Sequence, residues 1–593
     1  MGTSQRQTKP PTDEQKAVLM SPARITVVRA CPGAGKTEVF VEAIRQKLSR
    51  WTDPGAGLAA LSFTNIARET IEVRTGGAVQ SPHFIGTLDA FVFRFIVKPF
   101  GHLVGLPAGK VRLFPAVISE HLEDPSISVG NEQHQRASIF SVHFSGLVGV
   151  QPTISTRLPK IGRFNVQADR VNGILAEKRK FWKGTGIVTH SDCHFLASSI
   201  VHHRDHGAYV RQLLARRFPV LCIDELQDTG CFLGRTFLHL FGEPTVSGLV
   251  VGDPNQAIYG FGGASPTIFE DFETLPGAVS LPLNVSQRCP KTVSRLATAL
   301  SASGVAVESV TDAKEGKTTL LVHSLNEARL TPGQVQHIAG LISGTSLAVI
   351  TRTSAAAKAL KGDTIRDEFC GKSKSARRIN IAVQHMLNGA PREAAQIVER
   401  ELCRVVFGDE HANPEAMEDR TTTKAQWRTA IFRLLMTAIA TVKGETWNGW
   451  VERVKEAVRV AAVSLGWVEN KEAFRSYMKC NKEGVRLREE LFQVAVTALW
   501  KPADIVTTIH KVKGAEYDTV LIFARKPHKS QAPCPSVEWW PVAGDTEERR
   551  IAFVAVSRAK QHLILCIHKA THEAFKSTRP EFLALFGEIA ALP

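Results

Sequence analysis

Short apolar runs recur along both ends of the chain, and polar residues follow each run directly. Residues 25–28 lead into a glycine-rich stretch at 30–37, which is followed by residues 38–44 with apolar side chains at helical spacing. A similar stretch at residues 58–65 ends in polar residues, and further apolar runs lie at residues 219–223 and 248–251. Alternating strands and helices predict an α/β fold, in which ligands gather at the carboxyl ends of the strands.

The glycine-rich stretch at residues 30–37 is a candidate phosphate cradle. Its backbone N–H groups and the positive end of the next helix would point at one place, while Lys36 would bind the β/γ-phosphates and Thr37 would hold Mg²⁺. Ala30 stands where glycine is commonest, and the alternative is a chance glycine-rich turn. Gln15 could pair with an adenine edge, although a glutamine on a helix is nearly always just solvated. The loop residues expected to bind the nucleotide are Pro32, Gly33, Ala34, Gly35, Lys36 and Thr37.

Two carboxylates follow the apolar run at residues 219–223. We expect Asp224 to anchor Mg²⁺ through its water shell, and Glu225 to orient and deprotonate the attacking water. Gln256, which follows another apolar run, could read the γ-phosphate. The sequence therefore predicts a second, independent half of one nucleoside triphosphate site.

Aromatic and polar side chains at other strand ends are candidates for holding nucleic acid. Phe63, Thr64 and Asn65 follow one predicted strand, and residues 85–91 have the same design. Tyr259 and Phe261 offer faces on which bases could stack. The plain alternative is an ordinary strand-to-helix turn with Asn65 as a helix cap.

Composition narrows the class of protein. The chain has 593 residues, enough for roughly three to five domains. Its net charge of +16 suggests a polyanionic partner, although many basic proteins bind nothing specific. There is no run of about 18 apolar residues and no apolar signal core at the N-terminus, so we expect a cytoplasmic protein without a membrane partner. The ten cysteines include no CxxC pair, which argues against zinc, an iron–sulfur cluster or a disulfide framework.

The strand–helix signal fades between about residues 92 and 206, as expected for an inserted subdomain. Residues 177–183 mix cations with aromatic side chains and could touch nucleic acid, although a solvated helix end is the favoured interpretation. A group of histidines suggests a metal cluster, but their spacing matches no usual ligand pattern, so a metal is disfavoured. These histidines are His190, His194, His202, His203 and His206.

Several stretches in this order resemble the motifs of superfamily 1A DNA helicases of the UvrD/Rep/PcrA type. They run along both ends of the chain, and chance agreement over the whole set is negligible. They comprise Gln15, the glycine-rich stretch, and residues 62–65, 86–87, 224–229, 252–259, 284–290, 508–517 and 547–559.

The resemblance implies two RecA-like parallel-sheet domains, each with a mainly helical inserted subdomain. The first RecA-like domain is expected at residues 1–91 and 206–285, with its insertion at 92–205. The second is expected at residues 286–369 and 501–593, with its insertion at 370–500.

The resemblance also implies roles for single residues. Arg288 and Arg558 would reach from the second domain to the γ-phosphate and complete a catalytic set with Lys36, Glu225 and Gln256. His510 and Glu516 would link nucleotide to DNA, with Glu516 also in the ATP site beside Gln15. The DNA-binding residues implied are Phe63, Thr64, Asn65, Thr87, Tyr259, Phe261 and His510.

Three positions depart from the family pattern. Gln287 stands where an adenine-stacking tyrosine is usual, which would relax base selectivity. Asp89 replaces a common histidine, and Gly262 replaces an arginine that often contacts DNA, so the grip on DNA would be weaker or differently distributed. The insertion at residues 370–500 is short for the family and shows none of the motifs of its duplex-binding subdomain, so a protein-interaction surface is an alternative.

Two functions follow from the resemblance. The first is an ATP- and Mg²⁺-dependent translocase that moves 3′ to 5′ on single-stranded DNA and unwinds tailed duplexes. The second is a DNA-sensing ATPase subunit that works beside a separate nuclease, as in two-component anti-phage systems of the Gabija kind. No nuclease carboxylate cluster follows Arg558 in this chain.

Overall fold

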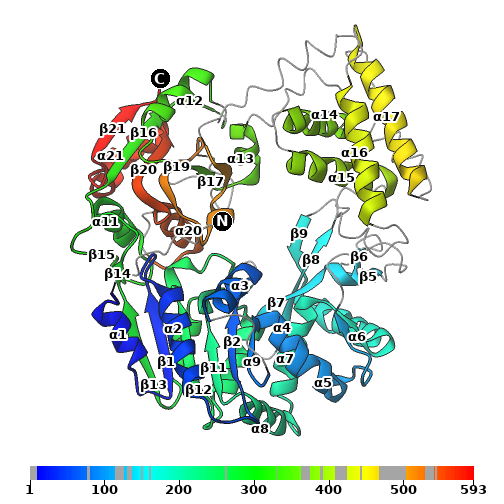
Figure 1. Ribbon diagram of the computed structural model, residues 1–593, viewed down its shortest axis with the longest axis vertical. Coiled ribbons are helices and arrows are strands. Elements are labelled where there is room, and N and C mark those ends of the chain that lie inside the picture. The colour runs from blue at the N-terminus through cyan, green and yellow to red at the C-terminus, as the bar shows by residue number, and fades with distance from the viewer. Residues whose placement is uncertain are drawn as a thin grey trace.

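The computed structural model defines two parallel sheets, each of six strands, with further elements inserted into each. It describes residues 10–75, 81–113, 126–129, 136–148, 151–158, 162–260, 263–326, 328, 330–361, 374–387, 391–407, 424–440, 444–465, 503–527, 540 and 544–593. Figure 1 shows the first sheet with its helices at the bottom, the second sheet at the upper left, and a bundle of helices at the upper right.

The first sheet has the order β13-β1-β12-β11-β2-β3, and all its pairings are parallel. Its strands are β1 (Ile25–Ala30), β2 (Leu58–Ser62), β3 (Phe84–Thr87), β11 (Val220–Ile223), β12 (Ser247–Gly252) and β13 (Ala278–Leu283). The helices around it are α1 (Asp13–Leu19), α2 (Lys36–Ser49), α3 (Asn65–Arg74), α4 (Leu88–Phe91), α8 (Gly207–Arg217), α9 (Cys231–Phe241) and α10 (Ile268–Glu273). Because the strands are parallel, the polar residues after β1, β2, β3, β11 and β12 meet at one edge of the sheet.

The second sheet is also parallel throughout, in the order β18-β17-β19-β20-β16-β21. Its strands are β16 (Lys317–His323), β17 (Leu347–Thr351), β18 (Ile505–Thr508), β19 (Tyr517–Phe523), β20 (Ala559–His568) and β21 (Glu588–Ala591). Its helices are α11 (Lys291–Leu300), α12 (Pro332–Gly340), α13 (Ser354–Lys361), α20 (Glu547–Val556), α21 (Lys569–Thr578) and α22 (Pro580–Leu583). A short parallel pair, β14 (Val285–Ser286) with β15 (Glu308–Ser309), lies on the connection between the two sheets.

The first insertion contains strands that the sequence analysis did not predict. In β7 the buried Val142 and Phe144 alternate with the exposed His143, which is the period-two pattern of a strand with one buried face. The helical elements here are η1 (Val92–Val97), α5 (Lys98–Phe100), η2 (Gly101–Val104), η3 (Ile139–Ser141), α6 (Ala168–Thr185) and α7 (His190–Val201). The strands are β4 (Arg112–Leu113), β5 (Ser126–Ser128), β6 (Arg136–Ser138), β7 (Val142–Val148), β8 (Gln151–Leu158), β9 (Gly162–Asn165) and β10 (Ile187–Val188), with β7-β8-β9 forming an antiparallel sheet.

The second insertion is helical where it is described, as expected. It comprises α14 (Lys374–Leu387), α15 (Pro391–Phe407), α16 (Lys424–Ile439) and α17 (Trp447–Ser464). These helices enclose a core of their own, in which Trp447 and Trp450 stack with ring centroids 4.9 Å apart. Among the described helices, none combines the length and apolar character needed to span a bilayer.

Burial on both faces explains why the strands of the first sheet read as nearly continuous apolar runs. Along β1, Val28 and Ala30 point into a core shared with helices α2, α11 and α20, which come from both sheets' units. Ile25 and Val27 point to the other side, into a core shared with α7, α9 and the first insertion. The first insertion is therefore packed onto the sheet, and its placement relative to the site is set by buried apolar contacts.

Candidate phosphate-binding cleft between the two sheets

The phosphate loop after β1 adopts a conformation that its glycines make possible. Gly33 and Gly35 have φ of 76° and 79°, in the left-handed region that favours glycine. A Cβ on Gly33 would lie 2.5 Å from the Cβ of Arg288, and one on Gly35 would lie 2.4 Å from Nε2 of Gln15. Both positions are thus closed to larger residues by backbone angle and by contact.

Two segments far away in the sequence hold this loop in place. The Ser286 hydroxyl donates to the carbonyl of Pro32 at 2.7 Å, and the Gln287 N–H donates to the carbonyl of Gly33 at 2.9 Å. From the other side, Nε2 of Gln15 donates to the carbonyl of Ala34 at 2.9 Å. Hydrogen bonds within the protein therefore order the loop, which lowers the cost of ordering it on binding.

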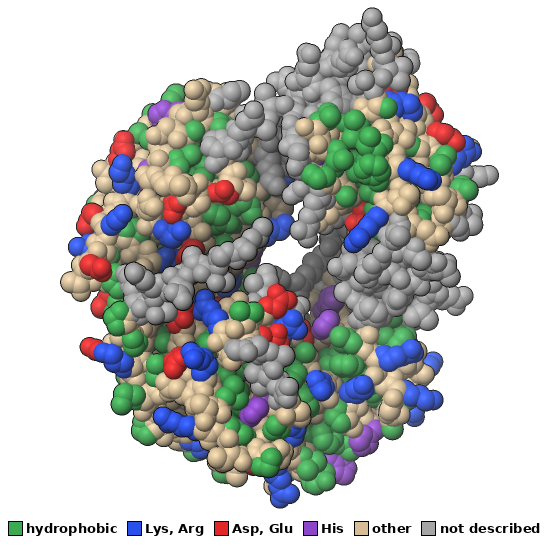
Figure 2. Space-filling model, in the orientation of Figure 1, with side chains coloured by type: hydrophobic (Ala, Val, Ile, Leu, Met, Phe, Trp, Pro, Cys, Tyr) green, Lys and Arg blue, Asp and Glu red, His purple; other side chains and the backbone are tan. Residues whose placement is uncertain are grey.

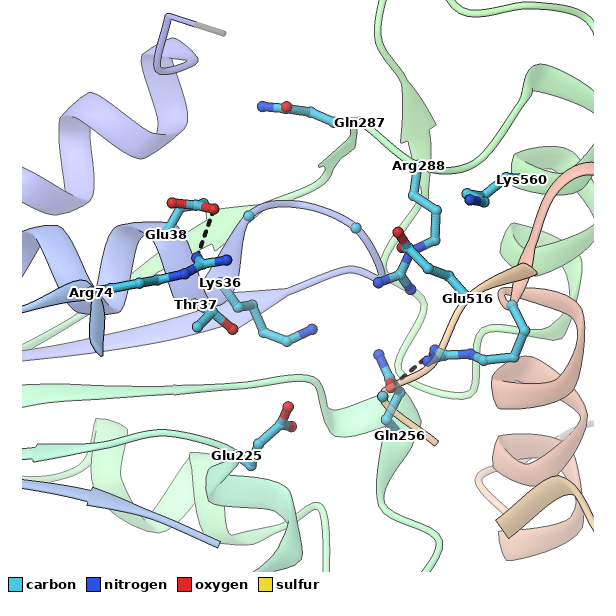
Figure 3. A pocket seen from close by; sticks show the side chains of 14 residues that line it. Lys36, Thr37, Glu38, Arg74, Glu225, Gln256, Gln287, Arg288, Glu516 and Lys560 are labelled. Carbon is cyan, nitrogen blue, oxygen red and sulfur yellow. Dashed lines mark hydrogen bonds and ion pairs between the residues drawn. The ribbon is translucent and has the colours of Figure 1, made fainter. Parts of the chain in front are cut away.

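A cleft of about 400 Å³ opens where the loop faces the second sheet (Figure 3). Nine of the residues predicted from the sequence line it, together with Glu38, Arg74, Gln287, Gly514 and Lys560. The predicted residues in the lining are Gly33, Gly35, Lys36, Thr37, Glu225, Gln256, Arg288, Glu516 and Arg558. Gln15, Pro32, Ala34 and Asp224 lie behind this surface rather than in it.

The carboxylates beside Lys36 carry unequal proton affinities. Burial, with Glu225 next in the chain, raises the pKa of Asp224 to about 7, and burial also raises the pKa of Asp253. Burial opposes the charge on Glu225 as well, but Lys36, Lys513 and a hydrogen bond from Gln227 keep its pKa below the ordinary value. Glu225 is thus the carboxylate that stays ionised, as a general base must.

Glu225 is also held in an unusual backbone conformation. Its φ is 55°, and it is the one residue other than glycine with positive φ in the described part of the chain. Such strain persists where the surroundings over-determine it and clusters at functional sites. Here the Glu225 N–H donates to Oδ1 of Asp224 at 2.9 Å, and Gln227 ties the Glu225 carboxylate to the Asp253 N–H.

These carboxylates fit a divalent cation. Asp224 is 2% exposed and Asp253 is fully buried, and Lys36 is the positive charge beside both of them. Such an excess of buried negative charge is stabilised by a cation bound to oxygen ligands, the kind that Mg²⁺ prefers. Thr37 and Asp224 are the residues that would hold it, directly or through water.

Two arginines close the cleft from the side of the second sheet. Arg558 is 1% exposed, and its Nη2 donates to Oε1 of Gln256 at 3.2 Å. Burial, with Arg288 nearby, lowers the pKa of Arg558 to about 9, which leaves it charged at neutral pH. Arg288 pairs with Glu516 at 2.6 Å. Tyr517 and Ala559 face each other where β19 and β20 pair, and this brings Glu516 and Arg558 together.

Lys513 is a site residue that the sequence analysis did not single out. Its Nζ lies 2.5 Å from the Asp228 carboxylate, donates to the carbonyl of Gln256 at 2.7 Å, and sits 4.8 Å from the centre of the Tyr259 ring. Burial raises the pKa of Asp228 to about 7 even with this cation in contact. The signal for Lys513 was its place in residues 508–517, a stretch already quoted for the family resemblance.

Helix α20 joins the cleft to the loop after Gln256. Arg558 follows its C-terminal end, while near its start the Glu547 carboxylate accepts from the Gly260 N–H at 3.0 Å. One turn further on, Nε of Arg550 donates to the carbonyl of Ala257 at 2.7 Å. The segment that carries Gln256 and Tyr259 is therefore bound to one helix of the second unit at both of its ends.

The structure brings together Phe63, Tyr259 and His510, three of the residues predicted to bind DNA, which we call the aromatic track. The rings of Phe63 and Tyr259 stack with centroids 5.9 Å apart, and His510 lies 6.4 Å from Tyr259. Phe63 is 38% exposed, so its ring is accessible to a ligand. Burial and Arg352 lower the pKa of His510, which favours its neutral form.

The remaining predicted DNA residues lie close by or outside the description. Thr64 is exposed just before α3, and Asn65 is the first residue of that helix. Thr87 caps α4 by accepting from the Ala90 N–H at 3.1 Å. Phe261 and Gly262 lie outside the described residues.

Asp89 has gained partners that the sequence analysis did not foresee. Its two carboxylate oxygens lie 2.5 Å from Nε2 of His194 and 3.4 Å from Nδ1 of His190, both on helix α7 of the first insertion. Two members of the suspected histidine cluster thus form an ion-pair group with Asp89. In the described part of the chain, the histidines belong to no group of three or more His, Cys, Asp or Glu side chains that could hold a metal ion by themselves.

The mixed segment at residues 177–183 contributes to the core rather than to a binding surface at two of its positions. Lys178 is fully buried and lies 2.5 Å from the Asp192 carboxylate, which also accepts from the Trp182 indole at 3.1 Å. Neither a solvated helix end nor a nucleic-acid contact describes these two residues. Arg179, Lys180 and Lys183 are exposed, as expected for the outer face of a helix.

Comparison with known proteins finds helicase relatives. The family described as the UvrD/REP helicase N-terminal domain matches residues 11–145 and 165–276, and the UvrD-like helicase C-terminal domain matches residues 500–570. DNA helicase II of Escherichia coli is 21% identical over 623 aligned positions, which cover 93% of this chain and 84% of the relative.

Two further relatives match over shorter spans. DNA helicase II of Salmonella typhimurium is 23% identical over 301 residues, or 49% of this chain and 40% of the relative. The Gabija protein GajB of Bacillus cereus is 26% identical over 246 residues, or 41% of this chain and 39% of the relative. The chain thus spans about two fifths of the length of each of these two relatives.

The contact between Lys513 and Asp228 predicts a stability effect. Lys513→Ala leaves a buried carboxylate without its cation and should cost about 3 kcal/mol, seen in calorimetry as a lower Tm. The matched control is Lys511→Ala, because Lys511 is exposed two residues away. Adding Asp228→Asn to Lys513→Ala should recover part of the loss, and a simple sum of the two single effects would contradict the pairing.

The Asp89 group predicts a pH-dependent effect. Burial opposes the charge on Asp89, but His190 and His194 hold its pKa well below the ordinary value, and the Asp89 hydrogen bond raises the pKa of His190. A histidine whose pKa is raised by folding stabilises the fold below its unfolded pKa and loses that contribution as pH rises through the folded pKa. Asp89→Asn should therefore lower Tm at about pH 6 and change it little at about pH 9.

The control for this experiment is Asp205→Asn, at an exposed carboxylate just beyond α7. It should leave Tm unchanged at both pH values. An equal loss at both pH values in Asp89→Asn would mean that the carboxylate acts without the histidine charges.

Proposed function

Because the chain belongs to the UvrD/Rep family of helicases, we propose that it is an ATP- and Mg²⁺-dependent DNA helicase that moves 3′ to 5′ on single-stranded DNA and unwinds tailed duplexes. The observation that carries this proposal is the composition of the cleft. Lys36 and Glu225 come from the first sheet, whereas Arg288 and Arg558 come from the unit of the second sheet. A triphosphate in this cleft would touch both units at once.

Hydrolysis in this cleft follows from the charges around it. Glu225 accepts the proton of the attacking water, because it is the carboxylate held in its ionised form. Lys36, Arg288 and Arg558 stabilise negative charge on the phosphoryl oxygens in the transition state. A bound Mg²⁺ would supply further neutralisation of the β- and γ-phosphate charge.

Contacts across the cleft support coupling of hydrolysis to movement. Arg558 is oriented by Gln256, and Lys513 joins Asp228 and the Gln256 carbonyl to the Tyr259 ring. A change in the distance between the two sheets would therefore change the surroundings of Tyr259 and Phe63. Arg288 and Arg558 favour the closed cleft only while phosphate charge is present. ATP turnover therefore opens and closes the cleft in cycles.

The second candidate function is a DNA-sensing ATPase subunit that acts with a separate nuclease in anti-phage defence. The similarity to the Gabija protein GajB favours it. The same cleft and track would then report DNA binding to a partner rather than drive processive unwinding. A strand-separation assay on tailed duplexes, run with and without the product of any neighbouring nuclease gene, separates the two candidates: unwinding by the chain alone favours the first.

Replacing the phosphate-binding Lys36 and replacing the general base Glu225 should stop ATP turnover in different ways. Lys36→Ala loses phosphate charge and should abolish both tight nucleotide binding and hydrolysis. Glu225→Gln keeps the shape of the site and should bind nucleotide while hydrolysis falls by about 10²–10⁴-fold. Steady-state phosphate release and equilibrium nucleotide binding measure the two effects.

The control for Glu225→Gln is Glu42→Gln on helix α2, where the side chain is 42% exposed and pairs with Arg45. It should hydrolyse ATP like the wild type. Near-normal turnover in Glu225→Gln would remove Glu225 from the role of general base.

If the aromatic track binds single-stranded DNA, removing one of its rings should lower the affinity for a single-stranded oligonucleotide. Phe63→Ala removes an accessible ring and should cost about 1–3 kcal/mol of affinity for a DNA oligonucleotide, the usual worth of one base–aromatic contact. Fluorescence anisotropy at two salt concentrations measures it, since phosphate contacts but not stacking weaken steeply with salt.

Tyr209→Ala is the matched control, because Tyr209 is 62% exposed on α8, the helix that leads into the amino end of β11. Its affinity for the oligonucleotide should equal that of the wild type. If Phe63→Ala is stable and binds like the wild type, the strand is held elsewhere.

A further inference from the structure

The two ends of the cleft offer a nucleotide very different surroundings. At the inner end, Lys36 and Arg288 lie beside the phosphate loop (Figure 3), and Arg558 lines the same cleft. At the outer rim, the labelled side chains are Glu38, Arg74 and Gln287, and Gln287 extends away from Lys36 and Gln256. Groups that bind phosphate are thus gathered at the inner end, whereas few side chains at the outer rim could contact a nucleobase.

The rim lacks a surface that would favour one base over another. Among the 14 described residues that line the cleft, none carries an aromatic ring. The planar group at the rim is the Arg74 guanidinium, which pairs with Glu38 at 2.7 Å. A guanidinium can stack on any base, because every base has a π-face.

The amide best placed to read a base edge is already committed to the protein. Gln15 is 5% exposed, its Nε2 donates to the carbonyl of Ala34 at 2.9 Å, and its Oε1 accepts from the Thr12 N–H at 3.0 Å. A Cβ on Gly35 would collide with this same Nε2, so the amide is packed against the loop. Gln15 therefore supports the phosphate loop and caps α1.

Gln287 cannot supply the missing discrimination. Its backbone N–H is bound to the carbonyl of Gly33, but its side chain is exposed. An exposed amide can turn either its oxygen or its nitrogen toward a ligand, so it matches the edge of any base. Strong discrimination requires buried polar groups that are left unpaired by the wrong ligand.

We infer that this cleft selects the triphosphate and accepts any of the four bases. The inference rests on the proposed function as a nucleoside triphosphatase and names its substrate class. The four ribonucleoside triphosphates should have kcat/KM values within about tenfold of one another, whereas a site built around base hydrogen bonds discriminates by about 10⁴-fold or more.

The test uses the full chain with Mg²⁺ and a single-stranded oligonucleotide. Phosphate release is measured with ATP, GTP, CTP and UTP, and Kd values for the same four are measured on Glu225→Gln, which should bind without turnover. Values within about tenfold in both measurements support the inference, and a preference for one base of more than about tenfold in either overturns it. If a folded protein hydrolyses none of the four, the proposed function fails, and the four Kd values still decide the inference.

Two variants separate loop support from base reading. Gln15→Ala should weaken the binding of all four nucleotides by the same factor, because it loosens the phosphate loop. A loss confined to ATP would mean that Gln15 reads adenine and would overturn the inference. Gln287→Tyr adds a ring at the rim and should lower the KM for ATP and GTP relative to UTP at least about threefold, since larger bases stack more strongly. An unchanged KM ratio would mean that the nucleobase does not lie at this rim, and this result would also overturn the inference.

Discussion

Negative charge buried at one end of the first sheet is the constraint on which the rest of the structure depends. Asp224, Asp228 and Asp253 are nearly inaccessible, and Glu225 lies beside them. Buried charges are tolerated only when they are paired or bind a cation. Of the described cations beside Glu225, Lys36 comes from the first unit, whereas Lys513 and Arg558 come from the second.

The second unit supplies positive charge through contacts that also connect the cleft to the aromatic side chains. Lys513 neutralises Asp228, and Arg558 donates to Gln256, so the interface between the sheets is held by charge at the nucleotide cleft itself. The same Lys513 lies over Tyr259, whose ring stacks with Phe63. The cleft and the aromatic side chains are therefore joined by a continuous set of contacts through Lys513.

The insertions are attached by different means. The first is continuous with the apolar core on one face of the first sheet, and the Asp89 group adds a charged contact at its start. The second has a separate core built around the tryptophans of α17. Figure 2 shows green hydrophobic side chains on the face of that helical bundle turned to the viewer, to the upper right of the central opening. The first insertion is therefore built as part of the sheet unit, whereas the second is built as a module with its own interior.

The sequence by itself determined the parts of this protein that depend on neighbouring residues. The apolar runs, the glycines that need left-handed φ, and the carboxylates that follow a buried strand are local features, and they predicted the sheets and the inner half of the cleft. The family resemblance added Arg288 and Arg558, which line that cleft, although no local pattern marks them. The period-two signal of β7 was missed because its alternation of buried and exposed residues ends at Phe144, where the pairing with β8 shifts register.

Only the tertiary structure decided which polar groups meet. Asp89 with His190 and His194, Lys178 with Asp192, and Lys513 with Asp228 each join residues 14 or more positions apart, and one of these pairs is 285 apart. A side chain's role in such a pair depends on burial and on the partner's charge, neither of which is encoded in its neighbours. For the same reason, the hydrogen bond from Nε2 of Gln15 to the carbonyl of Ala34 in the phosphate loop is not indicated by the residues around Gln15.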